Sequence, residues 1–254
     1  MPASAAPKHR GPMNTLVENA ISPQPISARP CVAPRRPDAL IFLHVPKTAG
    51  TTLWLILRRQ YSPAAVVRCD ADDFAPLHAL TPPERDQTRV FLGHFPFGLH
   101  QQLDRPATYV TVLRDPVERT LSRYAHVLRD GPDDACRPGD ACRPDDAARP
   151  GLSLEAYLTQ GLGEKDNWQT RLLAGPEAMA LPEGQCDRDV LEQAQRHLAE
   201  RFVVAGLTER FEETVLLLQR TFGWRLPCYA RENVGPRRLR QAQVPGEVMA
   251  LIRE

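Results

Sequence analysis

LIFLHVPKTAGTTLWLIL, residues 40–57, is the stretch that decides the fold. It opens with an apolar run of strand length and breaks at Pro46. A short segment rich in lysine, threonine and glycine follows, and apolar residues then return at spacings of three and four. This order predicts a strand, a tight loop and a helix.

The loop of this unit has the features of an anion-binding site. A helix N-terminus presents backbone N–H groups without intrahelical acceptors, Gly50 allows a ligand to approach closely, and Lys47 adds a positive charge. The G-x-x-x-x-G-K-[ST] pattern of nucleoside triphosphatases is absent, because here the lysine precedes the glycine. The alternative is a lysine beside an ordinary strand-to-helix turn.

Length and composition limit what this unit can belong to. The 254 residues, 42% of them hydrophobic, suit one α/β domain, which we place at residues 38–254 after a disordered tail of residues 1–37. A net charge of +1 argues against a surface that wraps nucleic acid. The six cysteines are scattered without a C-x-x-C pair, so we expect free thiols and no metal. With neither an apolar run of membrane-spanning length nor a signal region, we expect a soluble, cytoplasmic protein.

A histidine follows one of the next predicted strands. Residues 64–69 and 89–93 are short apolar runs that fit buried strands, and the second run ends directly before His94. Ligands of open α/β sheets bind outside the carboxyl ends of the strands, which makes His94 a candidate functional residue. The alternative is a packed or surface histidine, which is the more common case.

A second strand-to-helix junction lies at residues 108–119. The predicted strand 108–113 runs into RDPVER, where Asp115 suits a helix cap, Pro116 the first helical position and Glu118 a capping box. Val117, Leu121, Tyr124 and Leu128 then predict one buried helix face. Arg114, at the junction, and Ser122, two turns into the helix, could face one phosphate. The alternatives are an arginine paired with a neighbouring carboxylate and a small packing serine.

The remaining sequence alternates strands and helices. Helices are predicted at 153–160, 167–173, 189–200 and 209–222, and a strand at 202–206, which together indicate a mainly parallel sheet flanked by helices. Residues 131–151 contain three copies of a D-A-C/A-R-P pattern, which we interpret as a low-complexity surface loop. A basic loop at 229–240 includes Arg237 and Arg238 and could close over a phosphate-bearing ligand, although solvated arginines are the alternative.

Four of these segments together resemble one enzyme family. FLHVPKTAGTT at 42–52 resembles the 5′-phosphosulfate loop of sulfotransferases, and VLRDPVER at 112–119 with Ser122 resembles their 3′-phosphate motif. NWQTRLLAG at 167–175 and FVVAGLTERF at 202–211 are two further matches. Their order and spacing are similar to those of carbohydrate O-sulfotransferases, which include the heparan sulfate 2-O- and 6-O-sulfotransferases.

The resemblance implies a P-loop-like sulfotransferase fold and a donor, 3′-phosphoadenosine 5′-phosphosulfate (PAPS). On this basis Lys47 and the loop residues bind the 5′-phosphosulfate, Arg114 and Ser122 hold the 3′-phosphate, and His94 matches the catalytic base. Lys47 is then also catalytic, whereas we interpret His44 as the end of a strand. The loop residues concerned are Thr48, Ala49, Gly50, Thr51 and Thr52.

The expected reaction is in-line transfer of a sulfuryl group to a hydroxyl of a carbohydrate or glycoconjugate. The alternatives are a non-catalytic nucleotide- or glycan-binding module and a P-loop kinase. Two departures from the family pattern concern the acceptor: Leu92 replaces the first histidine of a His-Gly-His pattern, and the chain ends before the last helix usual in relatives, through natural shortness or truncation. The sequence does not identify the acceptor, the modified hydroxyl or the oligomeric state.

Overall fold

The computed structural model describes residues 38–69, 74–129, 151–160, 166–225, 229 and 239–253. The predicted tail of residues 1–37, nearly all of the repeat at 131–151, and Arg237 and Arg238 lie outside the described residues. The division into a tail and one domain therefore stays a prediction.

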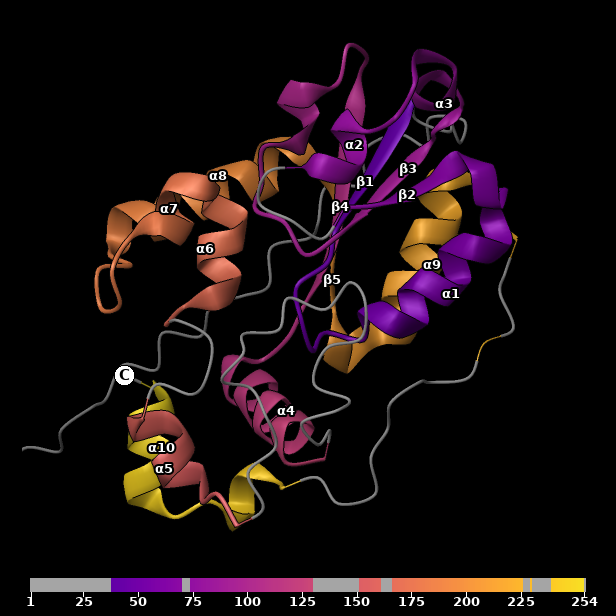
Figure 1. Ribbon diagram of the computed structural model, residues 1–254. Helices are drawn as coiled ribbons and strands as arrows, with labels where there is room; N and C mark the ends of the chain where they lie inside the picture. Colours follow the sequence, from indigo (N-terminus) through magenta and orange to yellow (C-terminus); the bar gives the residue numbers. More distant parts are fainter. Residues whose placement is uncertain are drawn as a thin grey trace, which may run out of the picture. The chain divides into compact units, whose positions relative to one another are not determined.

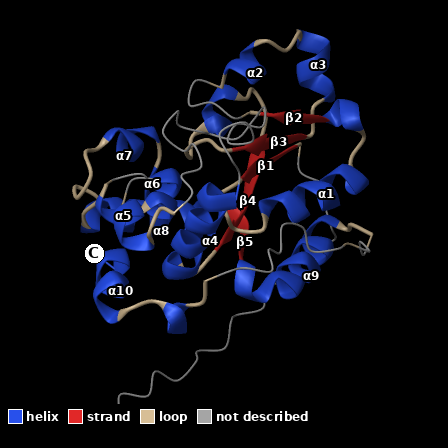
Figure 2. Ribbon diagram, turned by 60° about the horizontal axis from the view of Figure 1, so that its bottom comes forward, coloured by secondary structure: helices blue, strands red, loops and turns tan. Residues whose placement is uncertain are grey.

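In the part of the chain that the structure describes, the centre of the fold is a five-stranded parallel sheet (Figure 2). Its strands lie in the order β2-β3-β1-β4-β5, and every pair of neighbours is parallel. The predicted fold class, a mainly parallel sheet flanked by helices, is confirmed. The strands are β1 (Ala39–Leu43), β2 (Val66–Arg68), β3 (Val90–Gly93), β4 (Ala107–Leu113) and β5 (Phe202–Leu207).

Helices cover both faces of the sheet (Figure 1). Alternate side chains of β1 point to opposite faces, as in any strand, and all five residues of β1 are fully buried. Leu40 and Phe42 pack in the cluster with α1 (Gly50–Gln60) and α9 (Phe211–Phe222). The other face packs against α6 (Trp168–Ala174) and α8 (Arg188–Arg201). Burial on both faces explains why the strand sequence is continuously apolar.

The sequence located most elements to within a few residues. α1 ends at Gln60, Gly223 adopts the left-handed conformation that ends α9, and Ser153 caps α5 (Leu154–Thr159). Two prolines, at 76 and 82, stand in the first turns of α2 (Ala75–His78) and α3 (Pro82–Gln87). The short helix α7 (Pro176–Ala180) follows α6 directly.

A third apolar cluster joins α4 (Pro116–Arg129), α5 and α10 (Gly246–Arg253). Val117 and Leu121 of α4 are buried as predicted, but Leu128 is exposed, and α10 was not expected from the sequence. Arg119 and Arg123 are buried, so α4 is more enclosed than a helix with a single apolar face.

A buried arginine stabilises the segment around α6. Arg171 is fully buried and donates hydrogen bonds to the carbonyl oxygens of Ala178, Leu181 and Pro182, at 2.7, 3.0 and 2.8 Å. It also pairs with the Asp166 carboxylate at 2.7 Å. Burial raises the pKa of Asp166, but hydrogen bonds from Arg171, Asn167 and the Gly184 N–H outweigh it and hold this pKa below its usual value.

Among the described residues, the longest apolar helices are too short or too polar to cross a membrane.

Candidate functional site

The loop after β1 has an unusual backbone. Lys47 and Ala49 both adopt positive φ angles, 67° and 63°, a conformation that non-glycine residues rarely take. The Thr48 hydroxyl donates to the Val45 carbonyl oxygen at 2.7 Å and fixes the turn from inside. Backbones that enter the left-handed region in this way turn successive N–H groups to one side, which creates an anion-binding concavity.

Helix α1 starts directly at this loop. Gly50 is its first residue, and the Leu53 N–H donates to the Ala49 carbonyl oxygen at 3.2 Å to close the first turn. The N–H groups before Leu53 therefore lie at a helix N-terminus, where the helix itself provides no acceptor. The strand, loop and helix predicted from the sequence are confirmed, and their geometry favours an anion at this point.

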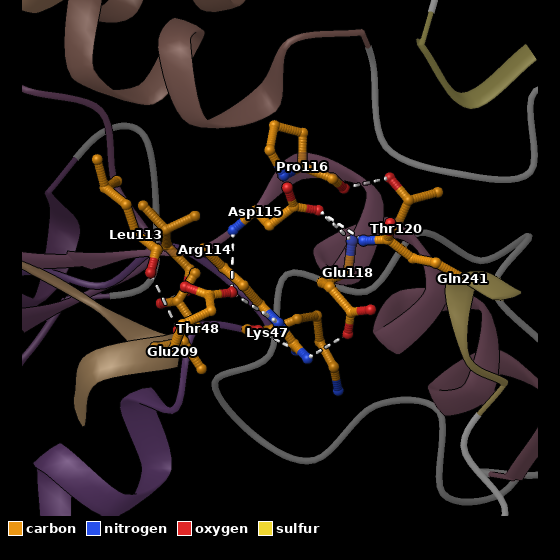
Figure 3. A network of polar contacts seen from close by, with 12 residues as sticks. Lys47, Thr48, Leu113, Arg114, Asp115, Pro116, Glu118, Thr120, Glu209 and Gln241 are labelled. Atoms are coloured by element: carbon orange, nitrogen blue, oxygen red, sulfur yellow. Dashed lines mark hydrogen bonds and ion pairs between the residues drawn. The ribbon is translucent and has the colours of Figure 1, made fainter. Parts of the chain in front are cut away.

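Arg114 connects the two predicted phosphate motifs (Figure 3). Its guanidinium donates from Nη1 to the Lys47 carbonyl oxygen at 2.9 Å, although 67 residues separate them in the chain. Nη2 lies 3.5 Å from the Glu118 carboxylate, and Nε lies 4.0 Å from that of Glu209. Nε makes no hydrogen bond within the described part of the chain, so this buried cation retains donor capacity.

Gln169 holds the main chain of Arg114. Its side-chain oxygen accepts a hydrogen bond from the Arg114 N–H at 3.0 Å, and its side-chain nitrogen donates to the Arg114 carbonyl oxygen at 2.8 Å. The amide thus replaces a neighbouring strand at the end of β4. Sequence reasoning assigned Gln169 no role of its own, although it lies within one of the four family-like segments.

Glu209 reaches the same junction from the end of β5. Its carboxylate accepts a hydrogen bond from the Asp115 N–H at 3.1 Å, and the neighbouring Thr208 hydroxyl donates to the Leu113 carbonyl oxygen at 3.0 Å. All four family-like segments therefore meet at the carboxyl edge of the sheet. Glu209 was also missed from the sequence, because its contacts are with residues about 95 positions away.

The predicted capping box of α4 is half wrong. Asp115 caps the helix by accepting from the Glu118 N–H at 2.9 Å, and it also accepts from the Gln241 side chain at 3.2 Å. The Asp115 N–H, however, donates to Glu209. The Glu118 carboxylate instead lies beside Arg114, because a buried guanidinium attracts a carboxylate more strongly than a backbone N–H does.

His94 lies at the same edge of the sheet, directly after β3. Its Nδ1 is 2.9 Å from the His44 carbonyl oxygen. Since a carbonyl oxygen only accepts, Nδ1 carries the proton of the neutral ring and Nε2 carries the lone pair. Strands β3, β1 and β4 are direct neighbours, so His94, the Lys47 loop and Arg114 all follow strand ends at one edge of the sheet, and their shared role stays a prediction.

His44 lies at the end of β1, as the sequence suggested, and its ring also packs against two neighbouring rings. Its ring stacks on Phe42 with centroids 5.3 Å apart, and it lies 4.3 Å from the His94 ring. Burial holds the pKa of His44 well below its usual value, and electrostatic interactions with His94, Arg68 and Lys47 act in the same direction. His44 is therefore neutral at pH 7.

For three other predicted site residues, the structure gives the helix position and the exposure. Thr51 is exposed and Thr52 buried in the first turn of α1, while Ser122 is half-buried in the second turn of α4. The phosphate-binding roles of all three stay predictions, as do those of Arg237 and Arg238. Among the described residues, His, Cys, Asp and Glu side chains form no group of three or more that could hold a metal, and Cys69 and Cys186 are free thiols.

The fold and the site together define an α/β protein whose sheet edge carries an anion loop, a second cationic group and a histidine. No family model matches the chain, but comparison with known proteins finds relatives of similar sequence. The chain is 28% identical over 225 residues to human heparan-sulfate 6-O-sulfotransferase 1, covering 73% of this chain and 54% of that protein. It is 29% identical over 227 residues to heparan-sulfate 6-O-sulfotransferase 2 of Danio rerio, covering 73% of this chain and 48% of that protein.

The chain thus spans about half the length of the curated relatives it matches, and it resembles carbohydrate sulfotransferases as the four segments indicated. Among solved structures, a mouse sulfotransferase, SULT7A1, complexed with PAP matches with a TM-score of 0.42 and 12% identity, over 85% of this chain and 63% of that one.

Proposed function

We propose that this chain is a PAPS-dependent O-sulfotransferase that transfers a sulfuryl group to a hydroxyl of a carbohydrate or glycoconjugate. The observation that carries the proposal is the hydrogen bond from Arg114 to the Lys47 carbonyl oxygen, 2.9 Å long. It brings two separate cationic groups against one loop. A donor with phosphate groups at both the 5′ and the 3′ positions of its ribose requires two such groups.

The donor site would divide the two phosphate groups between the two motifs. The loop N–H groups and the Lys47 ammonium would hold the 5′-phosphosulfate and stabilise the charge that grows on its bridging oxygen. Arg114, with Ser122, would hold the 3′-phosphate. Because Gln169 and Glu209 fix the main chain on both sides of Arg114, the guanidinium is positioned before the donor binds.

His94 would act on the acceptor. Its Nε2 has the lone pair that a general base needs, since the bond to the His44 carbonyl oxygen places the proton on Nδ1. As the acceptor oxygen attacks the sulfur in line, the S–O bond to the 5′-phosphate breaks and adenosine 3′,5′-bisphosphate leaves. The hydroxyl proton passes to His94, and no metal is assigned a role.

The acceptor class follows from the relatives. Their names specify heparan sulfate, a polymer of uronic acid and glucosamine, so glycosaminoglycans are the first acceptors to test. A polysaccharide or glycolipid of other composition is included in the same class. The cytoplasmic location expected from the sequence stays a prediction.

Radiolabelled transfer is the direct test. The protein is incubated with 35S-labelled PAPS and a panel containing heparan sulfate, desulfated heparan sulfate and chondroitin, and the saccharides are then separated and counted. Lys47→Ala and His94→Ala should abolish labelling, whereas Arg188→Ala, a change at a largely exposed side chain of α8, should leave it unchanged.

A nucleotide- or glycan-binding module of the same fold predicts a different result. It would bind adenosine 3′,5′-bisphosphate in calorimetry but would label no acceptor, including the acceptors in a crude glycan extract. Hydrolysis of ATP, with no binding of the bisphosphate, would instead support the kinase alternative and overturn the sulfotransferase proposal.

A further inference from the structure

The His44 ring fills the space beside Gly50, at the end of the Lys47 loop. A Cβ atom placed on Gly50 would lie 1.7 Å from His44 Nε2 and 2.0 Å from Cδ2, so the ring occupies the position that any side chain at residue 50 would need. The imidazole therefore requires glycine at this position. The contact joins the strand end to the first residue of α1.

The same ring touches the candidate base. The His44 ring centroid lies 5.3 Å from that of Phe42 and 4.3 Å from that of His94, and the plane of the His44 ring is inclined to those rings by 22° and 34°. The His44 main chain also makes two hydrogen bonds at the end of β3. Its N–H donates to the Gly93 carbonyl oxygen at 3.0 Å, and its carbonyl oxygen accepts from His94 Nδ1 at 2.9 Å. One residue thus contacts His94 through both its backbone and its side chain.

Three groups that can carry positive charge lie close enough to lower the pKa of His44: His94 after β3, Arg68 at the end of β2, and Lys47 in the loop. A protonated ring at position 44 would add a further charge at a site where a neutral His94 is needed to accept a proton. Burial and these charges keep the pKa of His44 low, so the ring fills the space without adding charge at pH 7.

We propose that His44 is a positioning residue for His94: its uncharged ring, packed on Gly50 and Phe42, supports the His94 ring in the orientation that directs Nε2 toward the acceptor hydroxyl. This inference rests on the proposed function, because it requires His94 to be the base. It assigns His44 no proton transfer of its own.

Substitutions that keep or remove a flat neutral group at position 44 test the proposal. In His44→Ala the backbone carbonyl remains, so any change in His94 comes from the missing ring. We expect kcat to fall about 10- to 100-fold, since a misplaced base loses its alignment. His44→Phe and His44→Gln fill the space with an uncharged planar group, and at least one of them should restore most of kcat. His78→Ala, at an exposed histidine of α2, is the control.

The second measurement does not depend on activity. 15N–1H spectra of the imidazoles give the tautomer and the titration midpoint of His94 in each variant, and thermal unfolding shows which variants are folded. We expect a single Nδ1–H tautomer in the wild type and in the rescued variant. In His44→Ala the unsupported His94 ring should turn away from the carbonyl oxygen of residue 44, which would give a mixture of tautomers. A purely structural role would lower the unfolding temperature without changing the His94 spectrum.

Two results would overturn the proposal. One is an unchanged kcat and His94 spectrum in folded His44→Ala. The other is an equal loss of kcat in the Ala, Phe and Gln variants, because His44 would then take part through its own nitrogens. Full transfer by His94→Ala would refute the proposed base, and the spectra would still decide whether the His44 ring orders His94.

Discussion

Replacing Arg114 with lysine should weaken binding of adenosine 3′,5′-bisphosphate more than binding of adenosine 5′-monophosphate. Lysine keeps the charge but loses the planar fork, so it cannot contact the Lys47 carbonyl oxygen and a phosphate together. Hydrogen bonds of charged groups contribute about 1.5–3 kcal/mol each, and the loss of one corresponds to roughly tenfold or more in affinity. Arg114→Ala, which also removes the charge, should cost about 3 kcal/mol or more, at least roughly 100-fold.

Isothermal titration calorimetry with both nucleotides separates the two motifs. The monophosphate lacks the 3′-phosphate, so it should register only the loss of support for the Lys47 loop. Arg188→Lys, at a largely exposed side chain, controls for a general effect of the exchange. Equal losses for the two nucleotides would refute the assignment of Arg114 to the 3′-phosphate, and unchanged affinity for both would remove Arg114 from the site.

Three further predictions concern the surrounding structure. Gln169→Ala removes both hydrogen bonds to the main chain at the end of β4 and should lower the free energy of unfolding in urea by about 1–3 kcal/mol, with weaker bisphosphate binding; unchanged binding would contradict its positioning role. Asp166→Asn should cost roughly 3 kcal/mol at pH 7 by breaking the pair with the buried arginine of α6. Because the pKa of Asp166 is lowered in the folded state, its contribution to the free energy of unfolding is present above the unfolded pKa of about 3.9 and is lost as the pH falls through the folded pKa. The Asn variant lacks this titrating group, so its stability should decline less in acid. An identical decline in both proteins would disprove this. Gly206→Ala places a Cβ 2.1 Å from the Thr214 side chain and should cost about 1–3 kcal/mol, whereas Gly246→Ala, with open space around it, should leave the melting temperature nearly unchanged.

Local sequence patterns predicted the elements that depend on local physics. The continuous apolar run of β1 and the Asp-Pro start of α4 signal their structures within a few residues, and the structure confirms both. α10 was missed because its eight residues are only partly buried, against α4 and α5 that lie far away in the chain. Its stability depends on tertiary packing, which a short helical pattern does not reveal.

The sequence predicted only those residues of the site whose positions follow from a local pattern. Lys47, Arg114 and His94 each follow a strand, so their convergence could be inferred once a parallel sheet was expected. Gln169 and Glu209 carry no local signal, because an amide or carboxylate that pairs with a distant main chain looks like any surface residue. The half-wrong capping box has this origin too, since the competing Glu209 is 94 positions from Asp115.

The positive φ angles at Lys47 and Ala49 imply a conflict between the thermal stability of the protein and the rigidity of the anion-binding loop. A non-glycine residue in the left-handed region stores about 1–3 kcal/mol of strain, which the folded chain carries permanently. Glycine at position 49 would release that strain but would also let the loop sample other conformations without a ligand. A selection for heat resistance alone would therefore favour glycine at position 49, at the cost of a less rigid anion site.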